Sequence, residues 1–62
     1  MTWELYEVWT EDDIGHQELI ETTKSLKEAR AIAQSSLIDY PIAVIYKETE
    51  DGDTVEIERL TL

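Results

Sequence analysis

Four stretches of the chain are rich in aromatic, β-branched and other apolar residues, with clean alternation of hydrophobic and polar residues over 54–60, and one stretch between them has helical periodicity. Side chains of a strand point alternately to its two faces, so alternation predicts strands. Large aromatic and β-branched residues in these stretches support the same prediction. The predicted strands cover residues 2–10, 17–22, 41–48 and 54–60.

The periodic stretch predicts one helix over residues 26–37. Ser25 is followed three residues later by Glu28, which is the pattern of a capping box at a helix start. Its apolar stripe recurs at helical spacing and consists of Leu26, Ala29, Ala33 and Leu37. Pro41 prevents the helix from continuing, because it restricts Tyr40 to extended conformations.

Two glycine-containing turns join the strands in pairs. Gly15 lies in the acidic turn between the first two strands, and Asp51-Gly52 lies between the last two. Asp-Gly favours a two-residue type I′ turn. Such a turn pairs Tyr46 with Ile57, which places the apolar residues of both strands on one face.

These elements predict a single α+β domain over residues 1–62, with the element order ββαββ. The four strands are expected to form one antiparallel sheet in the order 2-1-3-4, with the helix packed on one face. In this order every neighbouring pair of strands is antiparallel. The opposite face of the sheet has no second helix to cover it.

The first strand carries bulky apolar residues on both of its faces. Small alanines on the helix leave room for large side chains, which favours packing of the helix against the side of the sheet that holds the tryptophans. The side chains expected under the helix are Trp3, Leu5, Trp9, Val44, Tyr46, Val55 and Ile57. Tyr6, Val8 and Ile45 are then expected on the open face.

Glu7 conflicts with this arrangement, because it falls between Leu5 and Trp9 on the side expected to be buried. A lone carboxylate there would be costly. Three structural explanations remain open: an ion pair with Arg30, a bulge that turns Glu7 outward, or the reverse facing of the strand. A buried carboxylic acid with a raised pKa is the functional alternative.

The charge balance excludes several classes of partner. Fifteen acidic and five basic residues give a net charge of −10. Direct binding to nucleic acid or to an anionic membrane requires basic patches, which this chain lacks. The chain also has no cysteine and no long apolar run, so we expect no disulfide, no membrane span, no signal peptide and a cytoplasmic location.

The sequence holds no convincing catalytic, cofactor or metal site. Residues 47–58 have the spacing of a calcium loop, but Lys47 and Thr49 stand where the first two ligands should be. His16 is the single histidine and has no cysteine or second histidine to form a zinc site. We therefore expect a protein that is not an enzyme and needs no cofactor.

The expected function is protein–protein interaction or regulation, through the open sheet face or the acidic surface. The predicted interaction residues are Tyr6, Val8 and Ile45 at the centre, with Glu4, Glu56 and Glu58 at the rim. A homodimer through this face is one form, but like charge opposes it and favours a basic partner. The alternative is an inhibitor that mimics nucleic acid with rows of carboxylates, supplied by Glu4, Glu18, Glu21, Glu56 and Glu58.

Overall fold

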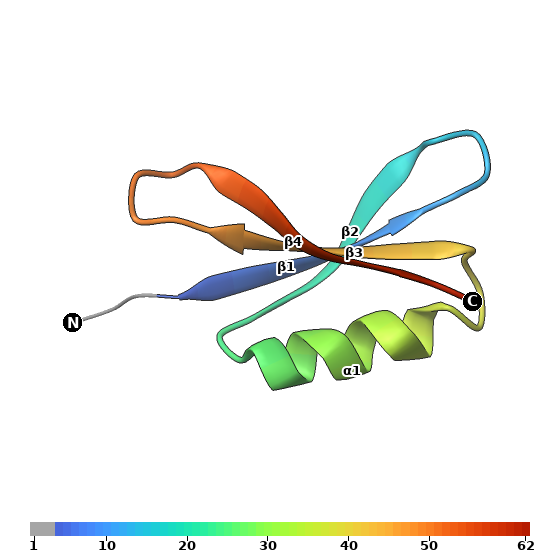
Figure 1. Ribbon diagram of the computed structural model, residues 1–62, viewed down its shortest axis with the longest axis horizontal. Coiled ribbons are helices and arrows are strands. Elements are labelled where there is room, and N and C mark those ends of the chain that lie inside the picture. The colour runs from blue at the N-terminus through green and yellow to red at the C-terminus, as the bar shows by residue number, and fades with distance from the viewer. Residues whose placement is uncertain (1–3) are drawn as a thin grey trace.

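The computed structural model describes residues 4–62 and confirms the predicted α+β architecture. Two hairpins flank a single helix in the chain, and one four-stranded antiparallel sheet has the order β2-β1-β3-β4 (Figure 1). The elements are β1 (Leu5–Glu11), β2 (Gln17–Thr23), α1 (Leu26–Ser36), β3 (Ile42–Glu48) and β4 (Thr54–Thr61). The helix lies along one side of the two central strands, β1 and β3.

The start of α1 follows the predicted cap with one change. The Ser25 hydroxyl accepts a hydrogen bond from the Glu28 amide at 3.3 Å, as a capping box requires. In a full capping box the Glu28 carboxylate would accept from the Ser25 amide. Here the Thr23 hydroxyl accepts from the Ser25 amide at 3.2 Å and donates to the Glu28 carboxylate at 2.8 Å. The last residue of β2 thus helps to fix where the helix begins.

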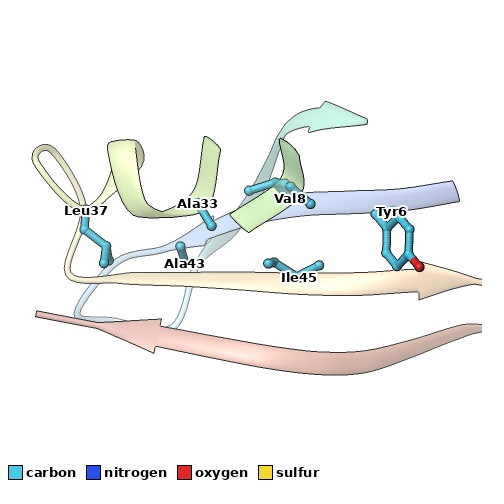
Figure 2. Packing of buried hydrophobic residues seen from close by; sticks show 7 residues of the cluster. Tyr6, Val8, Ala33, Leu37, Ala43 and Ile45 are labelled. Atoms are coloured by element: carbon cyan, nitrogen blue, oxygen red, sulfur yellow. The ribbon is translucent and has the colours of Figure 1, made fainter. Parts of the chain in front are cut away.

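The prediction of which sheet face carries the helix is wrong. The helix covers Tyr6, Val8 and Ile45, and these three side chains form the core with Ala43 (Figure 2). From α1 and its C-terminal cap, Ala29, Ala33 and Leu37 complete the buried cluster. Trp9 and Tyr46 lie on the opposite face, and Trp3 is outside the described residues.

The carboxylates of β1 account for this facing. The side of β1 that holds Leu5 and Trp9 also holds Glu7 and Glu11, whereas the other side presents Tyr6, Val8 and Thr10. Burying two carboxylates under a helix would cost more than leaving one aromatic ring partly in water. The alanines of α1 then allow a close approach instead of accommodating large side chains.

Ala33 of the helix and Ala43 of β3 show this close approach. Both are fully buried, and Figure 2 shows them pointing toward each other across the helix–sheet interface. Small residues on both surfaces bring the backbone of α1 near the sheet. The described residues of this interface therefore pack against one another without Trp9.

Both hairpins close with three-residue loops, so the predicted two-residue turn at Asp51-Gly52 is wrong. The Thr49 amide donates to the Asp53 carbonyl at 2.8 Å, and Gly52 has a φ of 89°. This is a type I turn followed by a left-handed glycine, a common hairpin closure. Tyr46 consequently pairs with Glu56, and Ile57 falls in a bulge.

The first hairpin has the same construction as the second. Asp12 and His16 close a loop in which Gly15 has a φ of 87°, matching Thr49, Asp53 and Gly52. Each outer strand also carries one bulge residue, since the β1–β2 register shifts at Ile20 and the β3–β4 register shifts at Ile57. Bulges and glutamates on both edge strands discourage pairing with another chain.

The correspondence between the hairpins describes a pseudo-two-fold axis through the centre of the sheet. The axis passes through the directly paired Val8 and Ile45, both fully buried. It relates Trp9 to Tyr46 and, at the starts of β2 and β4, Gln17 to Thr54. The helix lies on one side of the sheet only and breaks the symmetry.

Thr10 provides a test of the core beneath the helix. Its side chain is 1% exposed, and its hydroxyl has no hydrogen-bond partner among residues 4–62. A desolvated hydroxyl without a partner is destabilising. We expect Thr10→Val to stabilise the protein by about 1 kcal/mol, which raises the melting temperature by roughly 4–8 °C.

The control for this variant is Thr22→Val, a change of the same chemistry at an exposed position of β2. It separates removal of the buried hydroxyl from the general preference of strands for valine. Thermal unfolding followed by circular dichroism measures both. A Thr10→Val protein that melts no higher than Thr22→Val would contradict the assignment of an unpaired hydroxyl.

Candidate functional site

The face of the sheet opposite the helix, called here the open face, combines apolar side chains with carboxylates. Trp9 and Tyr46 occupy its centre, with their ring centroids 6.2 Å apart and their planes at 84°. The apolar residues around them are Leu5, Leu19, Val44 and Ile57. Val44 is fully buried although no helix covers it, so neighbouring side chains on this face shelter it.

A pocket of about 250 Å³ lies on the open face. Trp9, Tyr46 and Glu7 come from the central strands, while Gln17 and Thr54 come from the two outer strands. In Figure 1 the two hairpins extend away from the helix at opposite ends of the sheet. The pseudo-two-fold axis relates Trp9 to Tyr46 and Gln17 to Thr54, so the pocket lies near this axis.

Glu7 breaks the pseudo-two-fold symmetry of the pocket lining, because its equivalent, Val44, does not line the pocket. The Trp9 indole Nε1 donates to Glu7 Oε1 at 3.0 Å. Across the strands, Glu7 is paired directly with Tyr46. A carboxylate therefore stands beside two perpendicular aromatic rings.

A hydrogen-bonded network extends from the pocket over all four strands. Tyr46 Oη donates to Gln17 Oε1 at 3.2 Å, and Gln17 Nε2 donates to Glu11 Oε1 at 2.8 Å. Arg59 continues the network, because its Nη1 lies 3.5 Å from Glu11 Oε1 and its Nη2 lies 3.1 Å from Glu56 Oε1. The network holds the Tyr46 ring and the Gln17 wall of the pocket in place.

Arg59 is the cation of this network. Its hydrogen bond to Glu56, followed by the attraction of Glu56 and Glu11, holds the pKa of Arg59 above its ordinary value against the opposing effect of desolvation. Among the strand residues that the structure describes, Arg59 is the basic residue on the open face. Four carboxylates share this face, namely Glu7, Glu11, Glu48 and Glu56, so it is acidic.

The structure resolves the conflict posed by Glu7. Reverse facing of β1 is the explanation that holds, because Glu7 lies on the open face and Arg30 binds Glu58 instead, with Nε and Oε1 3.1 Å apart. The proposed buried ion pair with Arg30 is therefore wrong. Glu7 is half-buried and accepts from the Trp9 indole.

The predicted interaction residues do not form one surface. Tyr6, Val8 and Ile45 are core residues under the helix. Glu4 and Glu58 form ion pairs with Lys47 and Arg30, respectively, at 3.4 Å and 3.1 Å. Those predictions depended on the wrong facing of the sheet.

Glu56 is the predicted rim residue that lies on the open face, as the cross-strand partner of Tyr46. The glutamates suggested for a nucleic-acid mimic are also divided, since Glu18, Glu21 and Glu58 pair with helix-side residues of the sheet. Glu56 is thus separated from these three carboxylates, so the full set suggested for a mimic does not lie on one face.

Sequence reasoning missed Trp9, Tyr46, Gln17 and Thr54 as members of one site. The signal available was the charge on each face of the first strand, because Glu7 and Glu11 share a face with Trp9. Weighing the cost of burying carboxylates above the volume of the aromatics would have placed the tryptophan outside. Gln17 and Thr54 depend on how far the hairpins bend, which the alternation of residues does not encode.

Other kinds of site find no support in the described part of the chain. Residues 4–62 contain no group of three or more histidine, aspartate or glutamate side chains arranged to hold a metal ion. The one helix described is too short and too polar to cross a membrane. No protein family, curated protein or solved structure matches the chain.

The net charge of −10 predicts an unusual response to salt. The ion pairs among the described residues join partly exposed groups, and such pairs contribute little to stability. Screening of the remaining repulsion should dominate. We expect the melting temperature to rise by several degrees between about 20 mM and about 200 mM NaCl.

Thermal unfolding at several salt concentrations measures this effect, with sodium chloride and potassium chloride compared to exclude a specific ion. A melting temperature that falls with salt would show that local ion pairs outweigh the general repulsion.

Proposed function

We propose that the protein is a small non-catalytic interaction module that binds a basic protein partner through the open face. The observation that carries the proposal is the Trp9–Tyr46 pair at the centre of an acidic sheet face that no helix covers. Aromatic side chains with a polar rim are the usual centre of a protein interface. The absence of cysteine fits a partner in the reducing cytoplasm.

Charge selects the class of partner. The open face holds four carboxylates and one guanidinium, and the whole chain carries −10. A second copy would bring the same charges to the interface, and like charges opposite each other disfavour association. A basic surface gains from the same arrangement, both in encounter rate and in specificity.

The experiment compares capture of proteins from cytosol by the wild type and by matched variants. Trp9→Ala removes the centre of the open face, and Leu19→Ser changes an exposed apolar residue on the same face. Val55→Ser is the control, because Val55 is 52% exposed but pairs with Lys47 on the helix side of the sheet. Circular dichroism establishes that each variant is folded.

We expect a captured protein to bind Trp9→Ala at least about 30-fold more weakly, as for a central interface residue, and to bind Val55→Ser like the wild type. Leu19→Ser decides the result should Trp9→Ala unfold. A partner that binds both open-face variants as tightly as the wild type would refute the proposal.

Salt distinguishes this function from nucleic-acid mimicry. Binding that rests on a central aromatic pair should persist at about 300 mM NaCl, whereas a mimic that occupies a basic groove should lose its partner. Loss of binding at that salt concentration, together with insensitivity to Trp9→Ala, would favour mimicry.

A further inference from the structure

We propose that the open-face pocket binds the side chain of a single lysine of the partner, an inference that rests on the proposed function. The pocket of about 250 Å³ is lined by two perpendicular aromatic rings and one carboxylate, from Trp9, Tyr46 and Glu7. Small-molecule sites usually occupy roughly 300–1,000 Å³, so this pocket suits one side chain better than a larger ligand.

The aromatic rings supply the first half of the recognition. An ammonium group near the face of Trp or Tyr is attracted by the negative charge of the ring face. The Trp9 and Tyr46 rings stand edge to face at 84° with their centroids 6.2 Å apart, so a ligand would lie beside the pair, in the angle that the two planes form. The methylenes of a lysine would contact the same rings, which favours lysine over a free inorganic cation.

Glu7 supplies the second half. Its Oε1 accepts from the Trp9 indole at 3.0 Å, and its Oε2 has no hydrogen-bond partner among residues 4–62. A single carboxylate oxygen such as Glu7 Oε2 is enough for an ammonium group, whose charge is compact. A guanidinium prefers to engage both oxygens of a carboxylate in parallel, and the indole already occupies one of them.

The hydrogen-bonded network around the pocket holds the lining side chains in place. It also engages the neighbouring carboxylates, so Glu7 is the carboxylate that faces a ligand. Glu11 and Glu56 are both bound to Arg59, with Glu11 also accepting from Gln17. Tyr46 is fixed by its hydrogen bond to Gln17 at 3.2 Å. The pocket is thus built before a ligand arrives, which reduces the cost of binding.

The test uses the short peptide acetyl-Gly-Lys-Gly-amide and two matched peptides, with norleucine or arginine in place of lysine. Norleucine preserves the apolar stem and removes the charge. Nuclear magnetic resonance of the ¹⁵N-labelled protein follows the Trp9 indole N–H, identified by its loss in Trp9→Phe. We expect saturable millimolar binding of the lysine peptide and binding of the other two at least about fivefold weaker.

Variants of the protein locate the ammonium. Glu7→Gln keeps the shape of the side chain and its bond to the indole, and we expect it to weaken lysine binding at least about fivefold. Glu48→Gln removes an equal charge from the same face outside the pocket and should change binding less than about twofold. Melting temperatures of both variants show whether the fold is intact.

Three results would overturn the inference: no perturbation of the Trp9 indole by the lysine peptide, equal binding of the norleucine peptide, or equal losses in Glu7→Gln and Glu48→Gln. The inference and the proposed function fail separately. A partner captured through Trp9 by a protein that ignores the lysine peptide would overturn the inference alone. Peptide binding in the pocket with capture insensitive to Trp9→Ala and Leu19→Ser would overturn the function alone.

Discussion

Replacing Ile45 by alanine should leave little folded protein at 25 °C. Ile45 is fully buried at the centre of the sheet, opposite Val8 and beneath the helix. Deletion of a buried isoleucine side chain down to alanine costs roughly 2–5 kcal/mol, because transfer free energy is lost and a cavity remains. A core of this size rarely supplies more than about 3–5 kcal/mol in total, so the loss approaches the whole stability.

Ile57→Ala is the matched control for this prediction. Ile57 has the same side chain, but it lies in the bulge of β4 on the open face and is 40% exposed. We expect its replacement to cost about 1 kcal/mol or less. Urea unfolding followed by circular dichroism measures both free energies of unfolding.

The comparison also tests the orientation of the sheet. If the helix covered the tryptophan face, as the pattern of residue sizes favoured, Ile57 would be buried and Ile45 exposed. An Ile57→Ala protein that is less stable than Ile45→Ala would contradict the facing described here.

The architecture could be predicted because it depends on local patterns. The apolar, β-branched and aromatic residues of each strand, the cap at Ser25 and the break at Pro41 each determine a short segment independently of the others. The order of the strands then follows from pairing every strand with an antiparallel neighbour. These steps require no knowledge of which face is buried.

The facing and the register could not be derived in the same way, because each is a competition between energies of similar size. On β1, Trp9 favours burial of one face while Glu7 and Glu11 oppose it. At the second turn, Asp51-Gly52 fits a two-residue turn, but Gly52 serves equally well as the left-handed residue of a longer loop. The bulge at Ile57 compensates for the change of register.

The residues of the candidate site depend on both the facing of the sheet and the register of its strands. The predicted centre of the open face was Tyr6, which lies in the core, and Trp9 occupies the open face instead. The relation between the hairpins was not visible as a sequence repeat, because the corresponding residues Trp9 and Tyr46, or Gln17 and Thr54, share chemistry or position but not identity. Backbone geometry preserves the correspondence through Gly15 and Gly52.

Enlarging Ala33 should separate the helix from the sheet. Ala33 is fully buried and faces Ala43, so a leucine at this position has no space to occupy without moving the helix or its neighbours. Overpacking of this kind costs roughly 1–3 kcal/mol. We expect Ala33→Leu to unfold at a clearly lower urea concentration than the wild type, with a melting temperature lower by roughly 4–8 °C for each kcal/mol lost.

Ala31→Leu separates overpacking from any change in helix propensity. Ala31 is exposed on the same helix, and leucine is nearly as good a helix former as alanine, so this variant should change stability by less than about 0.5 kcal/mol. The pair therefore measures the closeness of α1 to β3 directly. A stabilised Ala33→Leu protein would show free volume between the helix and the sheet, and the explanation that alanines in α1 permit close packing would then be wrong.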